Sequence, residues 1–175
     1  NGNPLFRHQL WAPPETTPPR TVTIWVAGHV SGPRKKNAPP PPAGWGFHVL
    51  VNGQTILRMG GPVSLATPGV RTVTANLADL VAFSRALEWA RCDAAAHGAP
   101  VYLRYTHEYA AMIATGTWRA KKHAEVAKIA RENWTRLLKT KGDCLWMGHS
   151  TAPNRAKALA QAGTAGRTTN ERSAD

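Results

Sequence analysis

Two short clusters of basic residues carry the side chains best suited to chemistry, and that chemistry is the binding of phosphate. One cluster is Arg34-Lys35-Lys36, and the other comprises Arg119, Lys121, Lys122 and His123. The whole chain shares this bias, with 22 Lys and Arg against 10 Asp and Glu, a formal net charge of +12 and a pI of about 10.5. Such an excess indicates a polyanionic partner, nucleic acid before an anionic membrane surface. The plain alternative for each cluster is a solvated surface.

Other chemistries have little support in the sequence. Neither standard Gly-rich phosphate loop occurs, and no set of Cys and His has the spacing of a zinc site. Ser150 follows His149, but adjacent residues rarely form a nucleophile and its base. Cys92 and Cys144 are expected to be reduced thiols in the core. No run of about 18 apolar residues occurs, so we expect no membrane partner, and no metal, cofactor or small-molecule substrate either.

The elements that would position these residues begin with three strands. The β-branched and aromatic run Thr21–His29 predicts the first strand, and Gly44–Val51 and Gln54–Met59 predict a hairpin. Asn52-Gly53 supplies the turn of that hairpin because both residues tolerate a positive φ. Gly60-Gly61-Pro62 is expected to end the third strand. Residues 30–43, with four consecutive prolines, form an extended loop between the first two strands.

Helices and two further strands follow. Apolar residues at helical spacing predict a helix over Thr74–Ala95, with Leu77, Leu80 and Leu87 on its inner face. The remaining expected elements are, in order, a strand at Val101–Tyr105, a short helix at Tyr109–Thr115, a long helix at Lys121–Lys139, a strand at Asp143–Met147 and a helix at Asn154–Ala162. Val126, Ile129, Asn133 and Leu137 are expected on the inner face of the long helix. Hairpin-linked strands pair antiparallel and strands reached through helices pair parallel. The sequence therefore predicts an α/β fold, a mixed five-stranded sheet with helices on both faces.

Both ends of the chain differ in composition from the middle. Residues 1–20 hold five prolines and predict an extended arm, which Leu5, Phe6 or Trp11 could fix in place. Residues 163–175 are rich in Gly, Thr, Arg and Asn and predict a flexible basic tail. The domain proper is expected over residues 21–162. Because the sequence begins at Asn1 rather than Met, a leader is expected to have been removed or to lie outside it.

Six short motifs, in the same order as the predicted elements, carry a resemblance to one family. They are Asn37-Ala38-Pro39 with Gly44-Trp45-Gly46, Thr74-x-Asn76-x-x-Asp79-Leu80, Tyr105-Thr106-His107, Gly116-Thr117-Trp118 with Lys121-Lys122-His123, Gly148-His149-Ser150, and Arg155-Ala156-Lys157-Ala158-Leu159-Ala160. Each motif alone is weak, but together they cover about residues 21–162. In this combination the chain resembles ribonuclease H of type 1.

The resemblance implies a catalytic pocket whose carboxylates are mostly missing. The family holds two Mg²⁺ ions with four carboxylates, which activate water and stabilise the leaving oxygen. At the four matching positions this chain has Ala27, Asp79, His107 and Lys157. Only Asp79 remains a carboxylate, and Mg²⁺ prefers oxygen ligands. The four residues are expected to share one pocket. There Lys157 either pairs with Asp79 in place of the metals or points into solvent as an unselected replacement.

The resemblance also indicates residues that would contact a nucleic-acid backbone. Asn76 and Thr74 lie where the family touches the backbone, although Thr74 equally fits a helix N-cap. His149 would remain as a phosphate-facing loop donor. The full set of expected nucleic-acid contacts is Arg34, Lys35, Lys36, Asn76, Arg119, Lys121, Lys122 and His149. Trp118 and Trp134 are expected to pack in the core rather than to stack on bases.

Taken together, these patterns indicate a catalytically inactive ribonuclease H-like domain that is a structural, RNA-contacting part of a large ribonucleoprotein. A mitochondrial ribosome, in the mitochondrial matrix and with rRNA and neighbouring proteins as partners, is the specific expectation. The ribosomal assignment rests on an analogy with other inactive enzymes that have been recruited into large assemblies. One alternative is a degenerate nuclease that cuts RNA–DNA hybrids with Asp79, Glu108 and a further carboxylate. Another is a scaffold or tether domain of a retroelement polymerase.

Overall fold

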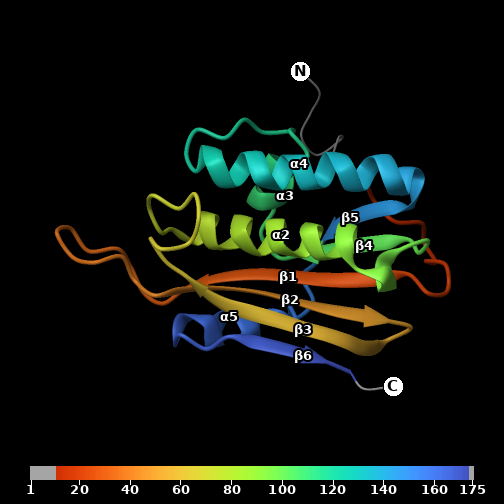
Figure 1. The fold of residues 1–175 in the computed structure, drawn as a ribbon, viewed down its shortest axis with the longest axis horizontal. Helices are drawn as coiled ribbons and strands as arrows, with labels where there is room; N and C mark the ends of the chain where they lie inside the picture. Colours follow the sequence, from red (N-terminus) through yellow and green to blue (C-terminus); the bar gives the residue numbers. More distant parts are fainter. Residues whose placement is uncertain (1–10, 174–175) are drawn as a thin grey trace.

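A twisted sheet of six strands forms the centre of the molecule in the computed structural model, which describes residues 11–173 (Figure 1). The strands follow the order β5-β4-β1-β2-β3-β6 across the sheet. Their bounds are β1 Val22–Val30, β2 Ala43–Val51, β3 Gln54–Val63, β4 Val101–Tyr105, β5 Leu145–His149 and β6 Thr169–Arg172. The prediction of a mixed sheet is confirmed, and the predicted count of five strands is wrong because β6 was missed.

The strand directions follow from the connections between them. β1, β2 and β3 pair antiparallel, and Asn52 and Gly53 form the expected turn with φ angles of 52° and 78°. β4 runs parallel to β1, and β5 runs parallel to β4. β3 does not end at Gly60-Gly61-Pro62 but continues to Val63, opposite Ala43 on β2.

Helices cover both faces of the sheet, as the sequence predicts. Their bounds are α2 Ala75–Cys92, α3 Tyr109–Ala114, α4 Ala124–Lys141 and α5 Lys157–Thr164. α2 lies directly on the sheet with α4 above it, whereas α5 lies on the opposite face, below β2 and β3 in Figure 1. Leu77, Leu80 and Leu87 are fully buried between α2 and the sheet. Full burial of such a side chain is worth about 2 kcal/mol, so this apolar face holds α2 in place.

Glycines on β2 and α5 allow α5 to lie directly against the sheet. A Cβ added at Gly44 would lie 2.0 Å from the carbonyl oxygen of Ala160, and one at Gly163 would lie 2.2 Å from that of Gly61. Both distances are far below any real contact of a Cβ atom. The backbone of α5 therefore touches the backbones of β2 and β3, and this contact sets how closely α5 lies on the sheet.

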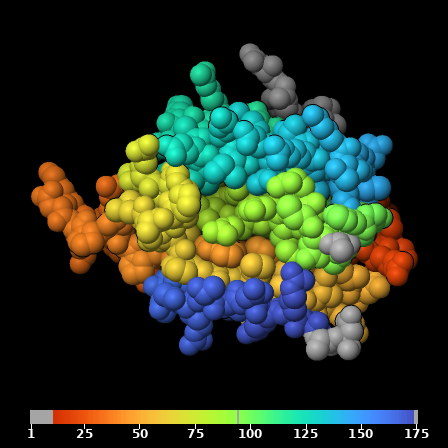
Figure 2. Space-filling view, in the orientation of Figure 1, coloured from red at the N-terminus to blue at the C-terminus, as the bar shows by residue number. Residues whose placement is uncertain are grey.

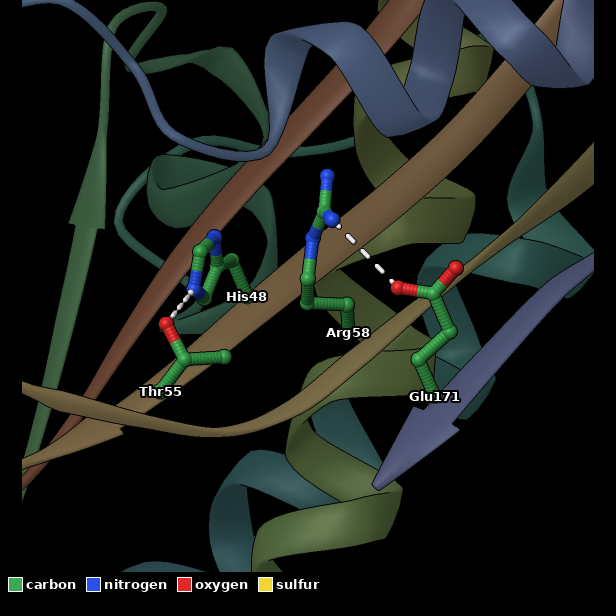
Figure 3. Close-up of polar contacts among 4 residues, drawn as sticks. All are labelled: His48, Thr55, Arg58 and Glu171. Carbon is green, nitrogen blue, oxygen red and sulfur yellow. Dashed lines mark hydrogen bonds and ion pairs between the residues drawn. The ribbon is translucent and has the colours of Figure 1, made fainter. Parts of the chain in front are cut away.

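The chain after α5 is not the flexible tail that its composition predicts. Gly163 and Thr164 belong to α5, and Thr169–Arg172 pairs antiparallel with β3 as β6. Glu171 forms an ion pair with Arg58 of β3 at 3.3 Å (Figure 3), and Ser173 N donates a hydrogen bond to the carbonyl of Ile56. Residues 174 and 175 lie outside the described part of the chain.

The described part of the N-terminal arm, residues 11–20, contains turns and bends but no helix or strand. Trp11 packs edge-on against Trp134 of α4, with ring centroids 5.2 Å apart, and its carbonyl accepts a hydrogen bond from Met147 N of β5. Trp134 is buried and Trp118 packs against the same core, as expected. Leu5 and Phe6 lie outside the described residues.

Three side chains that were expected to be buried, those of Cys92, Cys144 and Ile129, are exposed. Cys92 and Cys144 are free thiols but exposed, so the expectation of core thiols is wrong. Ile129 is 44% exposed, because the inner face of α4 follows Val126, Ala130 and Leu137. Within residues 11–173, none of the helices combines the length and apolar character that crossing a bilayer requires.

Candidate functional site

A pocket of about 230 Å³ lies where β1 and β4 end, and the four expected positions meet in it. Ala27, Asp79, His107 and Lys157 all line this pocket, which confirms that they converge. The further lining residues are Val26, Gly28, His29, Phe83, Tyr105, Thr106, Ala110 and Asn154. Phe83 and Tyr105 meet edge-on with centroids 6.0 Å apart, so the wall between α2 and β4 is aromatic and apolar.

Asp79 is held at the pocket wall by the main chain of β1. Gly28 N donates a hydrogen bond of 2.8 Å to Asp79 Oδ1. A Cβ at Gly28 would lie 2.2 Å from Asp79 N and 2.3 Å from the carbonyl carbon of Ala78. Only glycine therefore lets β1 pass this close to α2. The same contact fixes the direction of the carboxyl group.

Burial raises the pKa of Asp79 to about 6, although the Gly28 N–H and the nearby His107 both act to lower it. Burial disfavours the charged carboxylate because it loses hydration. A lone carboxyl with this pKa is partly protonated near neutral pH. Metal ligation requires the carboxylate, so the group is a poorer cation ligand than an ordinary Asp.

Asn154 joins the loop before α5 to the ends of two strands. Its Nδ2 donates to the carbonyl of Val26 at 2.9 Å and to Thr106 Oγ1 at 3.3 Å, and its Oδ1 accepts from Ala156 N at 2.9 Å. The sequence interpretation did not include Asn154 as a site residue. An Asn side chain commonly accepts a hydrogen bond from the main-chain N–H two residues later, which forms an Asx turn. Asn154 stands at the predicted start of a helix, and that position could have identified it.

Two of the four expected pocket positions carry no acidic group: Ala27 is apolar and Lys157 is cationic. Ala27 packs against the small cluster of Trp25, Leu50 and Ala156. Lys157 is exposed at the first residue of α5. Among residues 11–173 no ion pair joins Lys157 to Asp79, so of the two alternatives for Lys157 the structure has the solvent-exposed one. An exposed ammonium gains little from an ion pair, because water already solvates it well.

These residues do not fit the two Mg²⁺ ions that the resemblance implies. Asp79 is the single carboxylate among the residues lining the pocket, and Glu108 lies outside it at the start of α3. Over the part of the chain that the structure describes, no three His, Cys, Asp or Glu side chains are grouped to hold a metal ion. Mg²⁺ needs near-octahedral oxygen ligands. The pocket therefore offers Asp79 alone where a four-carboxylate site would be needed.

The expected nucleic-acid residues lie on exposed segments rather than in the pocket. Arg34, Lys35 and Lys36 lie on loop 31–42, which projects from the body of the molecule (orange in Figures 1 and 2). Arg119, Lys121 and Lys122 precede α4, which begins three residues later than predicted. Both segments lie on the side of the molecule toward which β1 runs, the left in Figure 1.

Two expected contacts lie at ends of other elements. Asn76 is exposed in the first turn of α2, next to Thr74, whose hydroxyl accepts a hydrogen bond from Leu77 N and so caps the helix. Thr74 Oγ1 also lies 3.2 Å from His123 Nε2, which ties the start of α2 to the start of α4. His149 ends β5 rather than lying in a loop, and its exposed ring contacts Tyr105 edge-on.

Solved structures of ribonucleases H resemble this arrangement. RNase H1 from the halophilic archaeon Halobacterium salinarum has 24% identity and a TM-score of 0.58, and the match covers 82% of this chain and 96% of that protein. LC11-RNase H1 in complex with an RNA/DNA hybrid has 20% identity and a TM-score of 0.61, over 83% and 97% of the two chains. LC9-RNase H1, a type 1 enzyme with the type 2 active-site motif, has 14% identity and a TM-score of 0.55, over 91% and 80%.

Sequence comparison adds no nearer relative. No protein-family model matches the chain, and no curated protein matches it either. The identities to the solved structures are all below 25%, so they speak for architecture alone. The strand order, the helices on both faces and these matches together show that the chain has a ribonuclease H-like fold.

Proposed function

We propose that this chain is a ribonuclease H-like domain that binds nucleic acid, RNA foremost, and does not hydrolyse it. One observation carries the proposal. The pocket at the ends of β1 and β4 holds a single carboxylate, Asp79, whose pKa burial raises to about 6, and it holds Ala27 and Lys157 where further acidic ligands would be needed. Two-metal hydrolysis requires a cluster of negative charge to gather its cations, and these side chains supply none.

Binding is supported by the charge of the chain and by where that charge lies. The net charge is +12, and all the Arg and Lys side chains of the two predicted basic clusters are exposed. LC11-RNase H1, which shares the architecture, has been crystallised with an RNA/DNA hybrid. Lys and Arg bind phosphates without reading the bases. We therefore propose that recognition depends on the backbone and is indifferent to sequence.

The same features support the assembly that we propose for the chain. Extended, basic and proline-rich segments suit a protein that threads between RNA helices and becomes ordered there. We propose a structural role in a large ribonucleoprotein, specifically a mitochondrial ribosome in the mitochondrial matrix, with rRNA and neighbouring proteins as partners. The nuclease alternative is not favoured, because Glu108 does not line the pocket with Asp79.

The test is a comparison of cleavage with binding on the same substrate. Purified protein with Mg²⁺ or Mn²⁺ is expected to retain an RNA–DNA hybrid in a gel-shift assay without cutting it. Asp79→Asn is the control, since it removes the only pocket carboxylate, and it is expected to bind equally. Cleavage by the native chain that disappears in Asp79→Asn would overturn the proposal and assign a degenerate nuclease.

The proposed assembly needs a separate measurement. A tagged chain expressed in its own cells is expected to sediment with a large particle, and to leave that particle after ribonuclease treatment. Mass spectrometry of the particle is expected to find ribosomal proteins. A reverse transcriptase as the main neighbour would instead identify a retroelement scaffold and contradict the ribosomal assignment.

A further inference from the structure

A basic groove of about 450 Å³ is lined by residues of α4 and of the segment just before it. α4 itself lies farther from the sheet than α2 (Figure 1). The charged residues that line it are Arg119, Lys128, Arg131, Glu132, Arg136 and Lys139, and small side chains, among them Ala124 and Ala127, form its floor. α4 forms one continuous band of the molecular surface in Figure 2, from teal to light blue. The charged side chains of this α4 groove are all exposed.

Helical spacing explains why the cations form a row. Lys128 and Arg131 are three residues apart, as are Arg136 and Lys139, so each pair is adjacent on the helix surface. Lys128 and Lys139 are eleven residues apart, about three turns, so the two pairs lie on the same side of α4. The opposite side of α4, with Val126, Ala130 and Leu137, is buried toward α2. Like charges three or four residues apart cost an isolated helix a few tenths of a kcal/mol per pair. An anionic partner along the groove would offset that cost.

The charge of the α4 groove is not neutralised within the molecule. Five cations and one carboxylate line it, a net charge of +4 (5 − 1). The ion pairs found within residues 11–173 all lie elsewhere. Glu125, the other acidic residue of α4, is already paired with Arg71 at 2.9 Å and does not line the groove. The row of cations is therefore available to an external polyanion.

The dimensions fit a nucleic-acid backbone. Eleven residues separate Lys128 from Lys139, about 16 Å along a helix. Each strand of a DNA duplex carries one phosphate per about 3.4 Å of helix axis, so a row of this length can meet several phosphates of a duplex. Arg131 and Arg136 can each donate two hydrogen bonds to one phosphate. No aromatic residue is among those lining the groove, so contact through phosphates rather than stacked bases is indicated.

We infer that the α4 groove is a binding surface for the phosphate backbone of RNA, separate from the pocket at the ends of β1 and β4. This inference rests on the proposed function, because it takes RNA as the partner. No residue of α4 lines that pocket, and no residue that lines the pocket lines the groove. The α4 groove thus adds a second surface for RNA to the exposed basic loop 31–42.

The experiment removes charge from the groove and, as a control, equally from elsewhere. The groove variant is Lys128→Gln with Lys139→Gln. The control variant is Arg20→Gln with Arg167→Gln, two exposed cations that line neither surface. Binding of a structured RNA hairpin is measured by fluorescence anisotropy from 50 to 200 mM KCl. Each lost phosphate contact lowers the slope of log affinity against log salt by about one unit.

The groove variant is expected to lower that slope by about two units and the control variant to leave it unchanged. Glu132→Gln, which removes the only carboxylate of the groove, is expected to tighten binding, and it reports on the groove without deleting a cation. If the native chain binds RNA but the groove and control variants have equal slopes, the inference about the α4 groove is overturned and the proposed function is not. A native chain that does not bind RNA would instead sink the proposed function.

Discussion

Asp79 is a largely buried carboxyl group whose position is fixed by a hydrogen bond from the main chain. The Gly28 N–H still directs its carboxyl group into the pocket, but no other carboxylate lines that pocket and no ion pair reaches it within residues 11–173. A charged Asp79 therefore costs free energy in the folded state. This cost lowers the free energy of unfolding at neutral and alkaline pH.

We predict that Asp79→Asn stabilises the protein in a pH-dependent way. The pKa is about 6 when folded against 3.8 ordinarily, so the stability that this group supports is present at low pH and lost as pH rises through about 6. The two values differ by an amount equivalent to about 3 kcal/mol. Asn stays neutral and can still accept the Gly28 hydrogen bond. Urea denaturation should show a gain of up to about 3 kcal/mol at pH 8 and little gain at pH 4.

The matched control is Asp143→Asn, which removes an exposed carboxyl far from the pocket and is expected to change stability little at either pH. An equal loss of stability at pH 4 and pH 8 in Asp79→Asn would show that the carboxylate is a structural ligand and would contradict the prediction.

The resemblance predicted where the four pocket positions meet, because they lie at strand ends and helix starts that the fold brings together. It did not predict their interactions. An ion pair between Asp79 and Lys157 looked reasonable from charge alone, but the ammonium is exposed while the carboxyl is held by Gly28. Asn154 was missed because its role depends on hydrogen bonds to Val26 and Thr106, which lie far away in the sequence.

Among the elements, the β2–β3 hairpin contains a buried histidine, His48. His48 is buried on β2, and its Nε2 lies 2.7 Å from Thr55 Oγ1 on β3 (Figure 3). Burial lowers the pKa of His48, and the positive charges of Arg58 and Arg155 lower it further. The neutral ring is therefore the form that the fold accepts.

We predict that acid destabilises the protein partly through His48. Its folded pKa lies below the ordinary value of 6.5, so its contribution to stability is complete above pH 6.5 and is lost as pH falls through the folded pKa. His48→Gln can keep a hydrogen bond to Thr55 and cannot be protonated. Thermal denaturation between pH 7.5 and pH 5 is expected to show a smaller loss of stability in the variant than in the native chain.

His97→Gln, at an exposed position, is the control and should follow the native chain. Asp79 has the opposite pH dependence and His123 the same one, so only the difference between the two variants is interpreted. If His48→Gln and the native chain lose the same stability, protonation of His48 does not affect the fold.

The sequence predicted the elements with strong periodicity and missed the element without it. Leu77, Leu80 and Leu87 recur at helical spacing because α2 buries one face, and β1 is rich in β-branched and aromatic residues, as a strand covered on both faces is. β6 has neither pattern. Thr169–Arg172 is polar and largely exposed, and it is a strand only because β3 offers it an open edge. Such an element depends on its neighbour and not on its own residues.

At the scale of the whole molecule, the excess of positive charge exceeds what its ion pairs can offset. Three ion pairs occur within residues 11–173, all with at least one exposed partner, against a net charge of +12. Exposed pairs contribute at most about 1 kcal/mol each. Repulsion among the remaining cations therefore opposes the compact state.

We predict that salt stabilises the isolated protein while it weakens RNA binding. Raising NaCl from 50 to 500 mM screens the repulsion and is expected to raise the midpoint of thermal unfolding. The variant Lys35→Glu with Lys36→Glu lowers the formal charge from +12 to +8 (12 − 4). The midpoint of this variant should depend less on salt. A midpoint that falls with salt in the native chain would show that attractive pairs outweigh the repulsion.

The position of β6 has a consequence for the biosynthesis of the chain. β6 follows every other strand in the sequence, yet it closes the edge of β3. Chains are made from the N-terminus and begin to fold before synthesis ends. Until Thr169–Arg172 emerges, β3 therefore presents unpaired N–H and C=O groups that a strand from another nascent chain could occupy. A product truncated before β6 would keep that edge open, so we expect such a product of this chain to self-associate.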